Sequence, residues 1–192
     1  MTRIVSGSVG GRTLQVPAKG TRPTSDRVRE ALFARLEHLG VVDGARVLDL
    51  YAGSGALGIE AVSRGAAHAT LVEAARPAVE VCRRNVAALG LAAQVAVVAD
   101  RAERFTARGA AQPWDLVLLD PPYDVPEKDL AAVLAGLPGH LSPDAVVVVE
   151  RSTRSPEPTW PAGLERFDER AHGETRVWSA QPVTQQSEDV LA

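Results

Sequence analysis

The chain has 192 residues, of which 45% are hydrophobic and 23% are charged, and its formal net charge is −3. This length suits one substantial domain, and the composition is that of a globular protein in water. No apolar run approaches the roughly 20 residues of a membrane helix, and the first residues lack the apolar core of a signal peptide. The single cysteine, Cys82, excludes an internal disulfide, so we expect a cytoplasmic protein.

The charges are unevenly distributed along the chain. Residues 1–40 contain seven basic and three acidic residues, a net charge of +4, whereas the remainder carries −7. A basic segment attached to an acidic body indicates a polyanionic partner that meets one end of the molecule. A solvated charged face would give the same count, so the alternative stays open at this point.

The first 40 residues predict a small extension. RIVSGSVGGRTLQVP is compatible with a hairpin that has a Gly-rich turn, and Thr24 or Ser25 can cap a following helix with Asp26 in its first turn. We therefore predict three segments: an N-terminal hairpin and helix over residues 1–40, a main domain over 41–182, and a frayed tail over 183–192.

The main domain alternates apolar runs with helical patterns. Strands are predicted over residues 45–51, 68–73, 94–100, 115–120 and 145–150, and helical patterns over 59–65, 76–90 and 128–137. Strands that are apolar at nearly every position belong in a sheet covered on both faces. The alternation predicts an α/β, Rossmann-like, doubly wound sheet with helices on both faces. After a loop, residues 163–182 predict a terminal hairpin that turns at His172-Gly173.

Acidic residues occupy the carboxyl ends of the predicted strands, where ligands bind in open parallel sheets. These residues are Asp49, Glu73, Asp100, Asp120 and Glu150. A row of acids along the least solvated rim of the fold is hard to explain by solubility alone.

The glycines 53, 55 and 58 form G-x-G-x-x-G between a strand and a helix. The motif alone is shared by nicotinamide, flavin and S-adenosylmethionine (SAM) proteins, and it can also be a purely structural turn. Asp49 would repel the pyrophosphate of a dinucleotide but suits the ammonium and sulfonium of SAM. We therefore predict a SAM site in which Glu73 accepts from the ribose hydroxyls and Asp100 from the adenine amine. Its predicted residues are Asp49, Gly53, Ser54, Gly55, Glu73, Asp100 and Arg101.

The run Asp120-Pro121-Pro122-Tyr123 ends the strand expected beside the first one. Methylation of an exocyclic base amine is a displacement at the sulfonium methyl, and the amine lone pair must be turned away from conjugation with the ring. The Asp120 carboxylate and the Pro121 carbonyl can accept the two N–H protons of such an amine. Tyr123 offers a flat face for an unstacked base. A simple strand terminator would need neither the acid nor the second proline.

Taken together, these motifs resemble the RsmD family. The resemblance runs from about Arg3 to Trp178 and includes RIVSGSVGGRTLQVP, RPTSDRVREALF, LDLYAGSGALGIEAVSRGA, DPPY and GETRVW. It implies a seven-stranded SAM-methyltransferase fold, SAM as cofactor, and methylation of the guanine N2 amine in 16S rRNA of the assembled or late-precursor small ribosomal subunit. The chain departs from the family pattern at Gly10, where a basic residue is usual, and at His172, where tyrosine is usual.

The basic N-terminal segment then supplies candidate phosphate contacts, namely Arg3, Arg12, Arg22, Arg27 and Arg29. Each arginine could instead form a surface ion pair, and Arg22 could order a loop over SAM. The four histidines have no metal-ligand spacing, so no metal is predicted. We expect a monomer without membrane attachment. The alternatives are a DNA or protein amino-methyltransferase and a non-catalytic ribosome-assembly factor that binds SAM.

Overall fold

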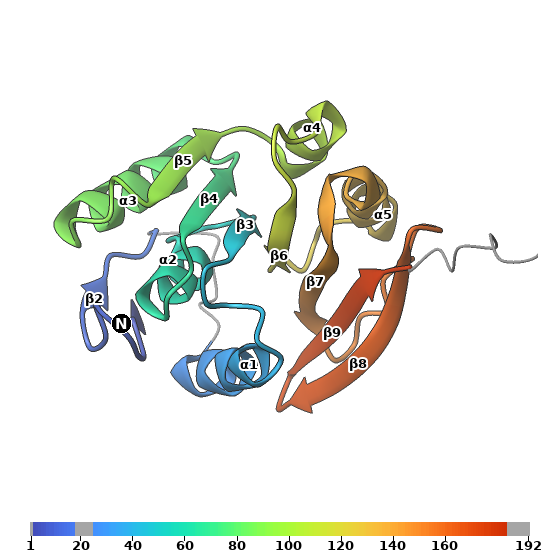
Figure 1. Cartoon of the computed structure of the whole chain (residues 1–192), viewed down its shortest axis with the longest axis horizontal. Coiled ribbons are helices and arrows are strands. Elements are labelled where there is room, and N and C mark those ends of the chain that lie inside the picture. Colours follow the sequence, from blue (N-terminus) through green and yellow to red (C-terminus); the bar gives the residue numbers. More distant parts are fainter. Residues whose placement is uncertain (1, 18–24, 184–192) are drawn as a thin grey trace, which may run out of the picture.

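The computed structural model describes residues 2–17 and 25–183 of the chain. Within these ranges a seven-stranded sheet runs in the order β5-β4-β3-β6-β7-β9-β8 (Figure 1). The first five strands in this order pair in parallel, and β9 pairs antiparallel with both β7 and β8. The strands are β3 (Arg46–Leu50), β4 (His68–Glu73), β5 (Val95–Ala99), β6 (Trp114–Leu119), β7 (Leu141–Ser152), β8 (Leu164–His172) and β9 (Thr175–Pro182). The predicted α/β fold is confirmed.

Helices cover both faces of this sheet, as the apolar strand sequences predict. The helices are α1 (Asp26–His38), α2 (Ala56–Ser63), α3 (Arg76–Ala88), α4 (Ala102–Arg108) and α5 (Glu127–Ala135), and a 3-10 turn η1 (Pro138–His140) follows α5. Successive strand residues point to opposite faces. Val47 accordingly belongs to the apolar cluster under α1, α2 and α3, whereas Leu48 belongs to the cluster under α4 and α5.

Several bounds differ from the prediction, since α2 begins three residues earlier and β7 extends over twelve residues instead of six, and two further details also differ. The short helix α4 has no counterpart among the predicted helices. The hairpin of β8 and β9 turns one residue later than predicted, at Gly173-Glu174, because His172 still pairs with Thr175. Gly173 has a φ of +61°, as the first central residue of a type II′ turn requires. The turn therefore lies where only glycine adopts the backbone conformation without strain.

The N-terminal extension consists of the short strands β1 (Thr2–Arg3) and β2 (Thr13–Leu14), which pair antiparallel, and of α1. The Ser25 hydroxyl accepts from the Val28 amide at 3.3 Å, so Ser25, one of the two candidates from the sequence, caps the helix. Ile4, Leu14 and Phe33 are buried in the same apolar cluster as the sheet. The extension thus shares a core with the main domain.

A buried carboxylate, Glu60 of α2, holds this extension in place. It accepts from the amides of Val5 at 2.7 Å and Ser6 at 3.0 Å. It also pairs with two guanidinium groups that are almost fully buried, those of Arg29 at 3.4 Å and Arg64 at 2.8 Å. One side chain therefore joins the hairpin, α1 and α2.

We predict that Glu60→Ala lowers the free energy of unfolding by about 3 kcal/mol, because the Val5 and Ser6 amides lose their acceptor and two buried guanidinium groups lose their only buried carboxylate partner. The carboxylates that these groups keep are partly exposed: Asp26 for Arg29, and Glu30 and Glu37 for Arg64. Urea denaturation measures this change. The matched control is Glu80→Ala, which removes an exposed ion pair with Arg83 and should change stability by less than about 1 kcal/mol. Equal effects of the two substitutions would contradict the role given to Glu60.

Candidate active site

A cavity of about 610 Å³ lies at the carboxyl ends of β3, β4, β6 and β7. This volume suits a ligand of the size of SAM. The described lining includes six carboxylate side chains and, as the one Arg or Lys among the described residues, Arg29. The carboxylates are Asp49, Glu73, Asp120, Asp124, Glu150 and Glu174. The cavity therefore favours a cationic ligand over an anionic one.

The glycine turn brings the first strand and α2 into close contact. Gly53 has a φ of +58° and its amide donates to Glu73 Oε2 at 2.9 Å. The Gly58 amide donates to Asp49 Oδ2 at 2.8 Å. A Cβ atom at Gly58 would lie 2.2 Å from Leu71 Cδ2 and 3.2 Å from Asp49 Cβ, so any side chain here would force buried Leu71 to move. The turn therefore determines how closely α2 packs on the sheet and where the carboxyl groups of Asp49 and Glu73 lie.

Tyr51, which follows β3, is the one described non-glycine residue with positive φ, at +63°. It lines the cavity beside Asp49 and Glu73. Burial, with the carboxylates of Glu103 and Asp129, raises the pKa of its hydroxyl to about 12. Backbone strain of this kind is kept where the surrounding structure holds it for a function.

Asp49 is fully buried below the glycine turn. Burial raises its pKa from 3.8 to about 8, opposed by the Gly58 hydrogen bond and assisted by the charges of Asp120 and Glu73. At neutral pH the carboxyl group therefore holds its proton. A bound cation would favour the carboxylate, so cation binding and proton release from Asp49 are coupled.

Glu73 ends β4 and reaches back across the cavity floor. Besides the Gly53 amide, it accepts from the Ala75 amide at 2.7 Å. A carboxylate has about four acceptor positions, so capacity remains for two hydroxyl donors. This arrangement is compatible with the predicted ribose contact. The predicted residues Asp49, Gly53, Ser54 and Glu73 all line the cavity, and Gly55 lies beneath the turn with a φ of +82°.

Asp100 and Arg101 are not brought together with these residues. They lie along a second groove, which adjoins the cavity at Ala75. Asp100 accepts from the Arg101 amide at 2.9 Å and pairs with Arg104 and Arg108 of α4. The chain enters α4 immediately after the edge strand β5. This turn directs Asp100 to Arg104 and Arg108, and Arg101 to Glu103, rather than into the cavity.

The residues of the DPPY run stand on the opposite wall. Asp120, Pro121, Pro122 and Tyr123 line the cavity directly after β6, which pairs with β3 as predicted. The Tyr123 side chain is exposed, at 52% of its accessible surface. An aromatic face is therefore available at the mouth of the cavity that contains Asp49 and Glu73.

The far rim was not among the predicted site residues. This rim consists of Ser25, which caps α1, Val28 of α1, and His172, Glu174 and Thr175 at the β8–β9 turn. His172, which stands where the family pattern has tyrosine, is thus part of the cavity wall. The sequence contained a signal for this position, because His172 directly precedes the family motif GETRVW.

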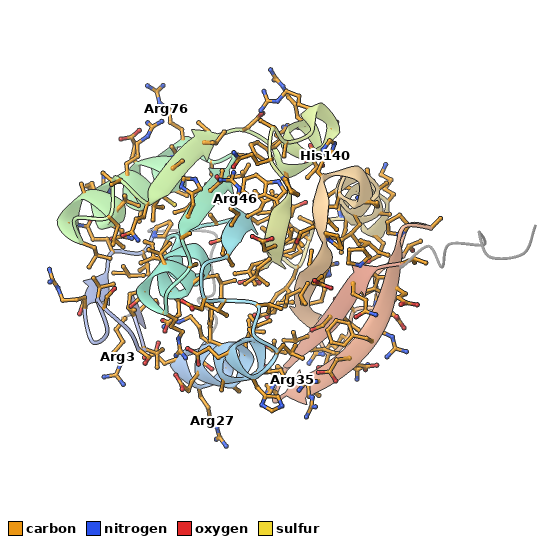
Figure 2. The ribbon with its side chains drawn as sticks, viewed as in Figure 1. Arg3, Arg27, Arg35, Arg46, Arg76 and His140 are labelled. Atoms are coloured by element: carbon orange, nitrogen blue, oxygen red, sulfur yellow. The ribbon has the colours of Figure 1, made fainter. Side chains whose placement is uncertain are left out.

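The predicted phosphate contacts divide into separate groups. Arg3, Arg12 and Arg27 are exposed, and Figure 2 shows Arg3 and Arg27 pointing outward near α1. Arg3 pairs with Asp26 at 3.1 Å. For Arg29 the prediction of an RNA contact is wrong, because its side chain is fully buried between Glu60 and Asp26. Arg22 lies outside the described residues.

The structure also bears on metal and membrane binding. Within residues 2–17 and 25–183, no cluster of three or more His, Cys, Asp or Glu side chains could hold a metal ion. No described helix is long and apolar enough to cross a bilayer.

Comparison with known proteins agrees with this geometry. The family described as Conserved hypothetical protein 95 matches residues 2–181. Ribosomal RNA small subunit methyltransferase D of Escherichia coli is 40% identical over 173 residues, which cover 90% of this chain and 85% of that protein. This chain belongs to the RsmD family.

Solved structures extend the match to the fold. A hypothetical protein of Thermus thermophilus is 32% identical, with a TM-score of 0.76 over 93% of this chain and 98% of that one. Magnesium protoporphyrin IX methyltransferase of Synechocystis, solved with bound SAM, shares only the fold, at 14% identity and a TM-score of 0.64 over 85% of this chain and 87% of that one. SAM is the cofactor of this methyltransferase class, and the acid-lined cavity fits its two cationic groups.

Arg151 is a residue of this RsmD-family site that sequence reasoning missed. It is buried in β7, and its guanidinium donates to the carbonyls of Pro122 at 3.4 Å and Val125 at 3.1 Å. It also pairs with Glu127 at 2.5 Å. These contacts fix the segment that follows Asp120. No local signal identifies Arg151, because its partners lie 24 to 29 residues earlier in the chain.

We predict that SAM affinity rises with pH from about pH 6 to 7.5, because the bound cation favours the ionised form of Asp49, whose pKa is about 8 without ligand. Calorimetry in two buffers of different ionisation enthalpy should detect proton release on binding. Asp49→Asn should bind SAM more weakly and show no such release. Wild-type binding that is independent of pH and buffer would contradict the coupling.

We predict that Arg151→Met lowers turnover at least about 10-fold while SAM affinity stays within about 3-fold, because misplacing a reacting group by about 1 Å is costly. Arg151→Lys should recover part of the rate. Exposed Arg154 provides the control, and Arg154→Met should leave the rate unchanged. A parallel loss of SAM binding and turnover would indicate general unfolding instead of loop positioning.

Proposed function

We propose that this chain transfers the methyl group of SAM to the exocyclic N2 amine of a guanine in 16S rRNA of the small ribosomal subunit. The observation that carries the proposal is that Asp120-Pro121-Pro122-Tyr123 lines one cavity with Asp49 and Glu73. The 40% sequence identity to ribosomal RNA small subunit methyltransferase D of Escherichia coli supports the rRNA substrate. The proposed substrate also implies action in the cytoplasm.

In this mechanism Asp49 and Glu73 hold the cofactor, with Asp49 facing its positive charge and Glu73 accepting from the ribose. When bound, SAM supplies an electrophilic methyl group whose sulfur leaves with the C–S bonding pair. Asp120 and the Pro121 carbonyl accept the N–H groups of the amine and direct its lone pair at the methyl carbon. Asp120 also stabilises the positive charge that develops on nitrogen until the amine passes a proton to this carboxylate or to water.

The charge of the cavity favours guanine among the bases with an exocyclic amine. Guanine presents two adjacent donors, the N2 amine and N1–H on one side of it, and the acceptor N3 on the other side. In adenine and cytosine the one ring nitrogen beside the amine is an acceptor. Ionised carboxylates only accept hydrogen bonds. Asp120, Asp124, Glu150 and Glu174 supply such acceptors around the mouth of the cavity. This wall suits the guanine edge and repels the ring nitrogen of the other two bases.

Tyr123 is placed to receive the base once it has left its stack. Unstacking costs a few kcal/mol, and stacking on an aromatic face returns about 1–3 kcal/mol per base. The exposed ring at the mouth of the cavity can provide this contact without any movement of β6. The base would then lie between Tyr123 and the acidic wall.

We predict that Asp120→Ala lowers turnover roughly 100-fold, because one preorganised group that stabilises transition-state charge is lost. SAM affinity should stay within about 3-fold of wild type. Labelled methyl transfer is measured on small subunits from cells that lack the protein, with naked rRNA, duplex DNA and a release factor as parallel acceptors.

The control is Asp144→Ala, an exposed acid near the opposite end of β7. Label recovered as guanine methylated on N2 supports the proposal. Full turnover of Asp120→Ala would remove the catalytic role of this carboxylate. Label only on DNA or the release factor would overturn the substrate, and SAM binding without any transfer would favour an assembly factor.

A further inference from the structure

A groove of about 680 Å³ lies at the carboxyl end of β5, between α3 and the start of α4. It adjoins the active-site cavity, since Ala75 lines both. Figure 2 shows Arg76, at the start of α3, on the far side of the molecule from Arg3 and Arg27. The groove is therefore separate from Arg3 and Arg27.

Arginines dominate the charge of this groove. Arg76, Arg83, Arg101 and Arg104 line it together with Glu80 and Asp100. Arg108 stands just behind them, paired with Asp100. Asp100 thus forms ion pairs with two guanidinium groups, those of Arg104 and Arg108. Arg76 has no ion pair or hydrogen bond among the described residues. With Glu103, which pairs with Arg101, three acids face five arginines, and the surface remains positive.

The guanidinium groups are available to a partner. The side chains of Arg83, Arg101 and Arg104 are 52%, 76% and 73% exposed. The 13-residue helix α3 begins at the groove with no acidic residue in its first turn and no side-chain cap on Ala75. Its positive end adds to the field of the arginines. Exposed arginine forks at a helix start match phosphate groups.

The neighbouring cavity has the opposite charge and repels phosphates. A nucleic acid that places a base among the carboxylates must therefore hold its backbone outside, and the groove offers a positive surface directly beside the cavity. We propose that the groove formed by Arg76, Arg83, Arg101 and Arg104 binds phosphates of the rRNA strand that flanks the target nucleotide. This inference rests on the proposed rRNA substrate.

The groove is built for the backbone and not for base reading. Its described lining has no aromatic side chain on which a base could stack. Contacts of this type position the strand without sequence information, and each contributes to the salt dependence of binding. The groove would thus set the direction in which the strand leaves the active site.

The test is the double variant Arg76→Gln/Arg83→Gln, which leaves Asp100 and its α4 partners intact. Binding to 16S rRNA and to small subunits is measured by fluorescence anisotropy over a salt series. We expect the affinity for rRNA to fall about 10-fold at low salt. The plot of log K against log[salt] should become less steep by about 1.4, because two phosphate contacts are lost. SAM affinity and turnover at saturating rRNA should stay at the wild-type level.

The control variant is Arg166→Gln/Arg170→Gln. These exposed arginines lie on β8, the opposite edge strand of the same sheet from β5. An rRNA affinity and salt slope equal to wild type in the Arg76/Arg83 variant would overturn the inference, as would an equal loss in the control. Failure of the proposed function looks different: wild-type protein would bind rRNA but transfer no methyl group, and the loss of binding in the groove variant would still support the groove.

Discussion

The hydrogen bond from the Gly58 amide to Asp49 determines how the active site is built. It places the start of α2 directly on the sheet, which is possible because residue 58 has no side chain that would collide with Leu71. The same contact holds a carboxyl group in the core below the glycine turn. Because the group is buried, its charge is costly until a cation arrives. The fold is thus prepared for a cationic ligand.

The strands could be predicted because they are buried on both faces and therefore apolar at nearly every position. Helix α4 could not, since a seven-residue helix with a mixed sequence carries little periodicity. The exact turn of the last hairpin was also missed. A shift of one residue at Gly173 depends on the pairing of β8 with β9, which local sequence does not encode.

Much of the site could be predicted for a related reason: the carboxyl ends of parallel strands meet along one edge. Asp49, Glu73 and Asp120 therefore line one cavity although they are far apart in the chain. Most failures concern arginines, whose long side chains find distant partners, and Asp100 is held outside the cavity by Arg104 and Arg108. Arg29 was predicted to face RNA, but Glu60 in another helix draws it into the core. Arg151 supports the Pro122 carbonyl from a different strand.

The acidic cavity and the exposed arginines around it are related features of the charge distribution. A methyltransferase that holds a sulfonium donor and an amine acceptor needs negative charge at its centre, and that charge repels the phosphates of its own substrate. The negative charges and the groups that bind phosphate must therefore lie on different parts of the surface. The carboxylates lie at the inner ends of the strands, and exposed guanidinium groups such as those of Arg76 and Arg83 lie around the outer edge. A base can then enter the acidic cavity only when its backbone remains at the rim, so the same field that attracts the cofactor also orients the nucleic acid.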